Sequence, residues 1–140
     1  MPAERPAAIT KELSRNDTGE TGGHQAGILI PKDELILAFF PPLNASVKNP
    51  RHHLRFTDPA GEKWEFAFIY YNNRYFGGTR NEYRLTRMTP FIRAANLKAG
   101  NILTLHRDGP VYTMTYQRGS HPDNSKRLKL GTTWRVVAIR

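Results

Sequence analysis

The chain of 140 residues contains no cysteine, which excludes disulfide bonds, thiolate zinc sites, iron–sulfur clusters and a cysteine nucleophile. Its longest apolar stretches, such as Leu35 to Phe40, are far shorter than the roughly 18 residues that a membrane span needs. The first ten residues lack the apolar core of a signal peptide. We therefore expect a soluble, unexported protein of the bacterial cytoplasm with no membrane partner.

Acidic residues are scarce in the second half of the chain. The first 70 residues carry 8 basic and 9 acidic side chains, whereas the last 70 carry 13 basic and only 3 acidic ones, namely Glu82, Asp108 and Asp123. The net charge of +9 is therefore concentrated in one half. Such a field attracts polyanions, which inside cells are mostly nucleic acid. A basic surface that serves only solubility is the alternative interpretation.

The apolar content of 39% is sufficient for a folded core, and the length favours one domain. We expect a single domain over residues 9–140 behind a flexible tail at 1–8. Period-two patterns and turn signals predict strands, and proline with carboxylates predicts a helix start at 31–34. The expected strands lie at 26–30, 53–57, 63–71, 82–88, 102–107, 111–117, 128–130 and 134–139, with a further alternating segment at 9–14. Short helices are expected at 31–40 and 89–97, and loops at 15–25, 44–51, 72–81 and 118–125. This pattern indicates a mainly β, barrel-like domain with short helices.

Common catalytic and cofactor motifs are missing. The glycines of 19–25 are not followed by the lysine of a phosphate-binding loop, and no Glu-x-Lys or Asp-x-Lys tripeptide follows a carboxylate cluster. His24, His106 and His121 stand alone in the sequence, which does not favour a metal site. We therefore expect no catalytic residue, no metal and no cofactor. A small nuclease or nucleobase enzyme with His24 as general base stays open as an alternative.

The segment from Gly77 to Arg87 holds the most informative pattern. In an extended conformation, Arg80, Glu82 and Arg84 project from one side. Guanidinium groups can bind guanine O6 and N7, and a carboxylate can accept a hydrogen bond from cytosine N4, so this triplet matches G·C pairs. Glu82 stands in a stretch otherwise depleted of acid, which favours base reading over phosphate binding. Ion pairs on a solvated strand face explain the same triplet equally well.

The first loop is a second polar segment. Residues 15–25 contain no aliphatic side chain and several glycines, so they form either an ordinary mobile loop or an arm that folds against DNA. Aromatic residues at Tyr70, Tyr71, Tyr75 and Phe76 can stack on bases or, for Tyr70 above all, pack in the core.

Two stretches resemble a known family. The run from Lys11 to Gly27, followed by Ile-Leu-Ile-Pro, is similar to the amino-terminal effector domain of EcoRII-like restriction endonucleases, UbaLAI included. The second match is Tyr70-Tyr71-Asn72 together with Gly77 to Arg84. The matched motifs cover some thirty residues and occur in the same order as in the family. The sequence departs from a member of the family at two positions. This chain has Glu12 where that member has a basic residue, and Tyr83 where that member has a lysine.

The resemblance implies a DNA-binding pseudobarrel similar to plant B3 domains. Such a domain grips duplex DNA in a cleft between two arms and reads the site CCWGG, where W is A or T. It implies a non-catalytic effector domain of a type IIE-like enzyme, in which binding of one site allosterically favours cleavage of another. The catalytic nuclease domain would then lie outside this chain and be its partner. A stand-alone nucleic-acid-binding protein, including one that binds RNA, is the alternative.

The motifs and the resemblance together assign roles to individual residues. Base-reading roles fall on Arg80, Asn81, Glu82, Arg84, His24 and Gln25. Roles in DNA backbone contact or arm structure fall on Lys11, Ser14, Arg15, Asn16, Asp17, Thr18, Thr21, Gly22, Gly23, Arg74, Tyr75, Thr79 and Arg87.

Overall fold

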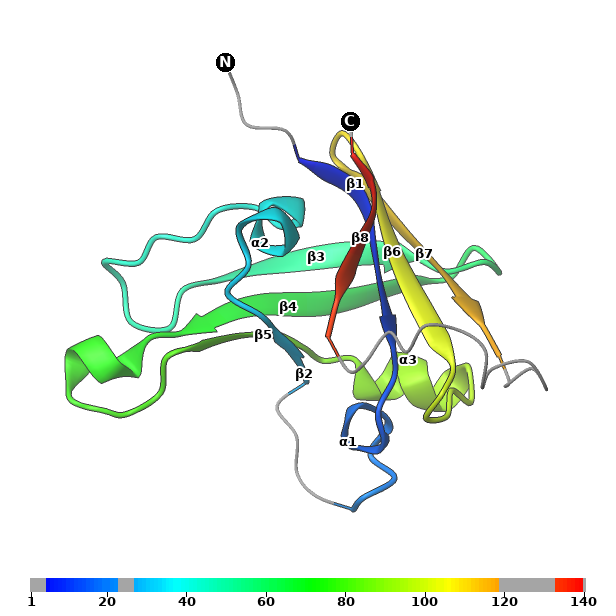
Figure 1. Cartoon of the computed structure of the whole chain (residues 1–140), viewed down its shortest axis with the longest axis horizontal. Helices are drawn as coiled ribbons and strands as arrows, with labels where there is room; N and C mark the ends of the chain where they lie inside the picture. The colour runs from blue at the N-terminus through cyan, green and yellow to red at the C-terminus, as the bar shows by residue number, and fades with distance from the viewer. Residues whose placement is uncertain (1–4, 23–26, 119–132, 140) are drawn as a thin grey trace.

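The computed structural model describes residues 5–22, 27–118 and 133–139 (Figure 1). Its strands are β1 (Pro6–Glu12), β2 (Ile28–Ile30), β3 (Arg51–Thr57), β4 (Lys63–Tyr71), β5 (Glu82–Thr86), β6 (Ile102–Asp108), β7 (Val111–Gln117) and β8 (Arg135–Ile139). Its helices are α1 (Arg15–Thr18), α2 (Glu34–Phe39), α3 (Thr89–Ala94) and the 3-10 helix η1 (Asn73–Phe76). Among the described residues, none of the helices is long and apolar enough to cross a membrane.

All eight described strands belong to one sheet, in the order β2-β5-β4-β3-β7-β6-β1-β8. Neighbours are antiparallel except β3 and β7, which run parallel. The sheet curves so that its two edge strands, β2 and β8, approach each other (Figure 1). The indole Nε1 of Trp134, just before β8, donates a hydrogen bond to the Leu29 carbonyl of β2 at 3.2 Å. This contact joins the two edges of the half-barrel.

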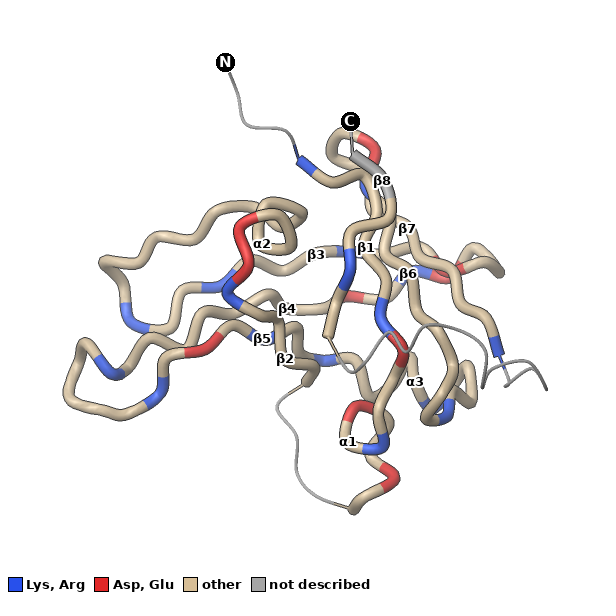
Figure 2. Tube along the Cα trace, viewed as in Figure 1, with Lys and Arg blue, Asp and Glu red and all other residues tan. Residues whose placement is uncertain are grey.

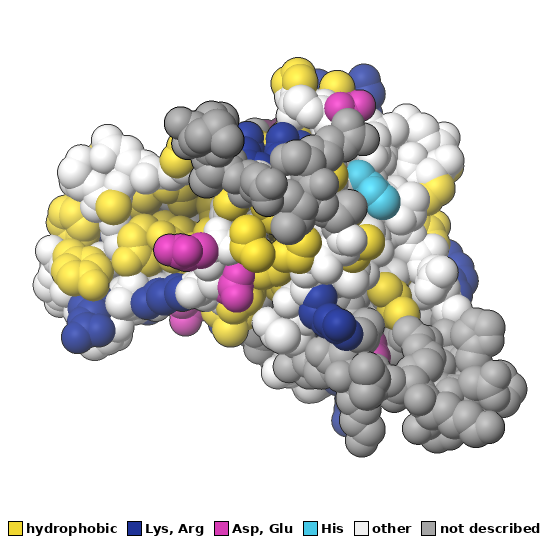
Figure 3. Space-filling model, turned by 45° about the horizontal axis from the view of Figure 1, so that its top comes forward, with side chains coloured by type: hydrophobic (Ala, Val, Ile, Leu, Met, Phe, Trp, Pro, Cys, Tyr) yellow, Lys and Arg dark blue, Asp and Glu magenta, His cyan; other side chains and the backbone are white. Residues whose placement is uncertain are grey.

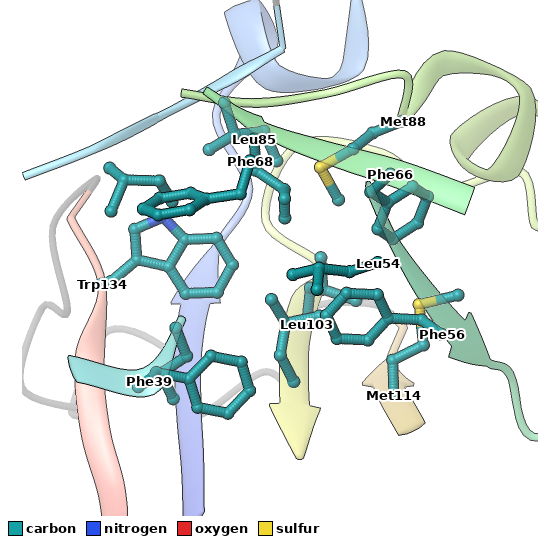
Figure 4. Close-up of a cluster of buried hydrophobic side chains, with 14 of the residues drawn as sticks. Phe39, Leu54, Phe56, Phe66, Phe68, Leu85, Met88, Leu103, Met114 and Trp134 are labelled. Carbon is teal, nitrogen blue, oxygen red and sulfur yellow. The ribbon is translucent and has the colours of Figure 1, made fainter. Parts of the chain in front are cut away.

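The inner face of the sheet is packed with aromatic and aliphatic side chains (Figure 4). Antiparallel pairing places Leu54 opposite Phe66 and Phe56 opposite Trp64, so alternate residues of β3 and β4 point into the core. Phe39 from α2 and Trp134 reach the same cluster from the other side (Figure 4). The core therefore spans the whole half-barrel and fixes the strand register at both ends of the molecule.

Local signals explain where α2 begins and ends. The Asp33 side chain caps the helix by accepting hydrogen bonds from the backbone N–H groups of Leu35 and Ile36. Pro41 and Pro42 follow directly and cannot continue the helical hydrogen bonds. Its buried residues, Ile36 and Phe39, are three positions apart and face the sheet.

The expected fold class is confirmed, since the molecule is a mainly β half-barrel with a few short helices. The expectation of a loose tail at 1–8 is wrong for residues 6–8. They form the start of β1, where Ala7 and Ala8 are buried and the strand pairs with both β6 and β8. These partners lie about a hundred residues away in the sequence, so no local pattern reveals the pairing.

Other boundaries also differ from expectation. The loop at 15–25 contains helix α1, and β3 begins at Arg51 rather than at residue 53. The strand expected at 128–130 lies outside the described residues. The remaining expected strands and both longer helices appear with small shifts at their ends.

We expect Trp134→Phe to lower the free energy of unfolding by about 1–2 kcal/mol. The change removes the indole donor and leaves the Leu29 carbonyl without it, while most of the buried ring is retained. Urea denaturation measures the loss. Val137→Ala, three residues further on within β8, is the control, because Val137 is 57% exposed and surface changes usually stay within about 0.5 kcal/mol. Equal losses for the two variants would contradict a specific role for the indole.

Candidate nucleic-acid interface

Two connections project from the sheet and carry most of the expected site residues. The first arm is residues 13–27, which joins β1 to β2, with 23–26 outside the described residues. The second arm is residues 72–84, which contains η1 and the start of β5. Lys and Arg positions lie along the β4–β5 end of the sheet and near α1 and α3 (Figure 2). Figure 3 shows that basic and hydrophobic side chains lie next to one another on the displayed face.

The base of the second arm is fixed by Asn72, whose side chain is fully buried. Its Nδ2 donates to the carbonyls of Ala45 and Val47 at 3.2 and 2.9 Å. Its Oδ1 accepts from the Asn49 N–H at 2.7 Å, and its own N–H donates to Asn49 Oδ1. The loop before β3 is therefore bonded to the start of the arm.

Asn73 closes the arm across its width. Its side-chain Oδ1 accepts from the Arg80 N–H at 2.6 Å, and its carbonyl accepts from the Gly78 N–H at 2.7 Å. A Cβ at Gly78 would lie 2.7 Å from the Asn73 side chain, so only glycine fits there without a shift. The Arg74 N–H donates to the Arg80 carbonyl at 2.9 Å. These bonds hold the arm in one conformation and fix the start of β5.

The structure brings Arg80, Glu82 and Arg84 together on one side of the second arm, as the spacing predicts. Arg80 Nη2 lies 2.7 Å from Glu82 Oε2, and Arg84 Nε lies 2.6 Å from the same oxygen. Both guanidinium contacts therefore fall on Oε2, and Oε1 takes part in neither. These hydrogen bonds, from Arg80 first and then Arg84, hold the pKa of Glu82 below its ordinary value. At neutral pH the group is a carboxylate between two cations.

Arg84 also connects the two arms. Its Nη1 donates to the Gly27 carbonyl at 3.1 Å, at the end of the first arm. Gly27 packs so closely against β5 that a Cβ there would lie 2.0 Å from the Leu85 carbonyl oxygen. The glycine also has a φ of +82°, which other residues rarely adopt. Sequence reasoning missed this role, although a glycine directly before a strand is the available signal.

An aromatic stack supports the other side of β5. The Tyr70 and Tyr83 rings are parallel at 4.2 Å, and Tyr83 is stacked at 5.8 Å on the buried Phe68. Tyr70 donates its hydroxyl hydrogen to Asn81 Oδ1 at 2.7 Å. Burial raises the pKa of the Tyr70 and Tyr83 hydroxyls, so both stay protonated at neutral pH. Asn81 is thus positioned from the core side.

The first arm contains helix α1, where a loop is expected from the sequence. The Ser14 side chain accepts from the Asp17 N–H, and the Asp17 carboxylate accepts from the Ser14 N–H at 2.9 Å. This reciprocal capping box starts the helix, and the Ser-x-x-Asp spacing is its signal. The Glu20 carboxylate accepts from the Ala99 N–H at 2.7 Å, which ties the arm to the turn after α3. Hydrogen bonding from Thr18 above all lowers the pKa of Glu20.

Lys11 does not lie where a DNA backbone contact requires it. Its side chain is 4% exposed, and its ammonium group forms an ion pair with the Asp17 carboxylate. The ammonium also donates to the Glu12 carbonyl at 3.4 Å. Of the two roles expected for Lys11, DNA backbone contact and arm structure, its burial against Asp17 favours the second. Sequence reasoning missed the pair since both partners looked like surface charges.

A model of the family described as Restriction endonuclease EcoRII, N-terminal, matches residues 4–104, which include both arms. The chain belongs to the EcoRII N-terminal family. The Type II restriction enzyme EcoRII of Escherichia coli is 43% identical over 101 residues, which cover 68% of this chain and 24% of EcoRII. The chain therefore spans about a quarter of the length of that relative.

Plant proteins share the fold of this EcoRII N-terminal family member. The B3 domain-containing transcription repressor VAL1 of Arabidopsis thaliana is 33% identical over 100 residues, covering 71% of this chain and 11% of VAL1. The solved Arabidopsis FUS3–DNA complex superposes with a TM-score of 0.61 and 23% identity, over 79% of this chain and 96% of that one. The expected resemblance to plant B3 domains is confirmed at the level of the fold.

The remaining expected site residues of this EcoRII N-terminal domain fall into three groups. The half-buried residues are Ser14, Asp17, Thr18, Arg80, Asn81, Glu82 and Arg84, and among them the side chain of Asp17 is itself buried. Exposed residues are Arg15, Asn16, Thr21, Gly22, Arg74, Tyr75, Thr79 and Arg87. Gly23, His24 and Gln25 lie outside the described residues. Within the described part, no three His, Asp or Glu side chains cluster in a way that could hold a metal ion.

We expect Lys11→Met to destabilise the domain by about 3 kcal/mol, because it leaves the Asp17 carboxylate buried without its cation. Urea denaturation measures the change. Arg15→Met, four residues further along the chain, is the matched control, since Arg15 is exposed and the loss of stability should stay within about 0.5 kcal/mol. A Lys11 variant as stable as the control would show that the pair does not hold the arm.

Proposed function

We propose that this domain binds duplex DNA sequence-specifically, at a CCWGG-type site, as the non-catalytic effector domain of a type IIE-like restriction endonuclease. Its partner in that enzyme is a catalytic nuclease domain outside this chain, and the enzyme acts in the bacterial cytoplasm. Membership of the EcoRII N-terminal family and alignment to 24% of EcoRII support this assignment. The solved relative with this fold is described as a complex with DNA.

The row of Arg80, Glu82 and Arg84 is the observation that carries the proposal. Two guanidinium groups flank one carboxylate at hydrogen-bond distance, in a rigid segment whose backbone is bonded to Asn73. Guanidinium donors suit guanine O6 and N7, and the carboxylate suits cytosine N4–H. Since both arginines use Oε2, the second oxygen of Glu82 is the acceptor that we assign to cytosine. The row thus matches adjacent G·C pairs.

The first arm completes the proposed cleft. We assign base contacts to His24 and Gln25 alongside Arg80, Asn81, Glu82 and Arg84. Contacts to the DNA backbone fall on the exposed polar residues of both arms, such as Arg15, Asn16, Arg74 and Thr79. Ser14 and Asp17 instead shape the arm through the capping box.

We expect Glu82→Ala to lose affinity for a CCWGG duplex and to bind a scrambled duplex as well as, or better than, the parent. The variant removes the cytosine acceptor and also a negative charge that repels phosphates. Fluorescence anisotropy at a stated salt concentration measures both affinities. Replacing the contacted cytosine by thymine, whose O4 is an acceptor, should weaken the parent more than the variant.

The two proteins and two duplexes form a double-mutant cycle, with an expected coupling of about 1–3 kcal/mol. Zero coupling at every C·G position would leave Glu82 as a structural residue of the arm.

Arg84→Ala should likewise lose about 1–3 kcal/mol of binding free energy on the cognate duplex and much less on the scrambled one. Incubation of the parent chain with Mg²⁺ and the cognate duplex tests the effector role, and cleavage of that duplex would overturn it.

The concentrated positive charge predicts strong salt dependence of binding. If five to eight phosphates are neutralised, log K against log salt should fall with a slope of roughly −4.5 to −7. Arg15→Met should reduce the steepness by about one because Arg15 is exposed on the first arm. Lys11→Met should keep the parent slope, since its ammonium is buried against Asp17. A slope near zero for the parent would remove the electrostatic basis of the proposal.

A further inference from the structure

The Arg80 guanidinium rests on an aromatic ring. Its central carbon lies 3.7 Å from the centroid of the Tyr71 ring, which is a close cation–π contact. Tyr71 is directly opposite Glu82 in the pairing of β4 with β5. The same guanidinium therefore contacts a ring through one face and the Glu82 carboxylate through Nη2 at 2.7 Å. These two contacts together fix the plane and the direction of the Arg80 fork.

Arg80 needs such support more than Arg84 does. Arg84 lies within β5, is 19% exposed in its side chain, and is held by both Glu82 and the Gly27 carbonyl. Arg80 precedes the strand and its side chain is 39% exposed. A long exposed side chain loses rotamer freedom when it binds, and a contact that already restricts it reduces this loss.

Tyr71 is itself well placed to act as a platform. It is the last residue of β4 and is half-buried. The next residue is Asn72, whose buried amide bonds fix the backbone at this point. The backbone that carries the Tyr71 ring is therefore held in place beside the Arg80 guanidinium.

We infer that Tyr71 is a positioning residue for base recognition, whose ring holds the Arg80 guanidinium in the orientation that reads guanine. The inference rests on the proposed function. It assigns to Tyr71 an effect on sequence discrimination, which a residue that only stabilises the fold or contacts phosphates would not have.

The test compares Tyr71→Leu, which removes the ring, with Tyr71→Phe, which keeps it. We expect Tyr71→Leu to weaken cognate binding roughly fivefold with scrambled binding unchanged, and Tyr71→Phe to stay within about twofold of the parent. Tyr116→Leu is the matched control because the Tyr116 ring, on β7, also lies under a guanidinium. The central carbon of Arg118 is 5.1 Å from the centroid of that ring. It should leave the ratio of cognate to scrambled affinity unchanged.

A cycle with Arg80 separates positioning from direct contact. In an Arg80→Ala background, Tyr71→Leu should cause no further loss of cognate affinity. A full loss in that background, or equal losses on both duplexes, would overturn the inference. Arg80→Lys keeps the charge but loses the planar fork, so it should weaken cognate binding by itself and remove the effect of the Tyr71 ring. If Tyr71→Leu does not fold, Tyr71→Thr removes the ring in its place, since a β-branched residue suits the end of β4, and it is expected to give the same results.

The Arg84→Ala variant separates a failure of the positioning role of Tyr71 from a failure of the proposed base reading. If Arg84→Ala lowers the ratio of cognate to scrambled affinity and Tyr71→Leu does not, the positioning role is wrong and the proposed function stands. If neither the Arg84 nor the Glu82 variant changes the ratio, the proposed base reading is wrong, and the role of Tyr71 falls with it.

Discussion

The position of β5 between β4 and β2 is the constraint on which the rest of the site depends. Pairing on both sides fixes the register of the strand, so its side chains alternate between core and solvent without freedom to slip. Leu85 and Tyr83 are thereby directed towards Phe68, while Glu82 and Arg84 lie on the opposite face. Because Gly27 is packed against the Leu85 backbone, the same strand also sets where the first arm ends.

Both arms are held by side chains that bond to the backbone of distant segments. Asn72 fixes the second arm to the loop before β3, and Glu20 fixes the first arm to the turn after α3. The loss of conformational entropy at these bonded residues thus occurs during folding rather than on binding, which favours affinity for a ligand of matching shape. The Lys11–Asp17 pair serves the same end within the first arm.

Local patterns in the sequence predicted much of this architecture. The β3–β4 hairpin, helix α2 and the β6–β7 hairpin at Asp108-Gly109 follow from periodicity, capping and turn chemistry, which act over a few residues. The common face of Arg80, Glu82 and Arg84 followed from the two-residue period. The start of β1 at Pro6 and the burial of Lys11 did not, because strands and a carboxylate brought close by the fold decide them. Glycine at 27 and asparagine at 72 likewise gain their roles from segments far along the chain.

Under the proposed function, the ion pairs of Glu82 with Arg80 and Arg84 explain why an acidic side chain in a basic domain would favour discrimination between DNA sequences over affinity. In the free protein each guanidinium already has Glu82 Oε2 as a partner, so in the proposed base contact its positive charge is partly neutralised and it gains less from binding DNA than an unpaired arginine would. A wrong base presents an acceptor to the carboxylate or a donor to a guanidinium, and a group left unpaired in a water-excluded contact is costly. Because the ion pairs restrict all three side chains together, none can turn aside singly to avoid the mismatch. The ion pairs are therefore compatible with the proposed base reading, since they would supply the rigidity that such reading requires.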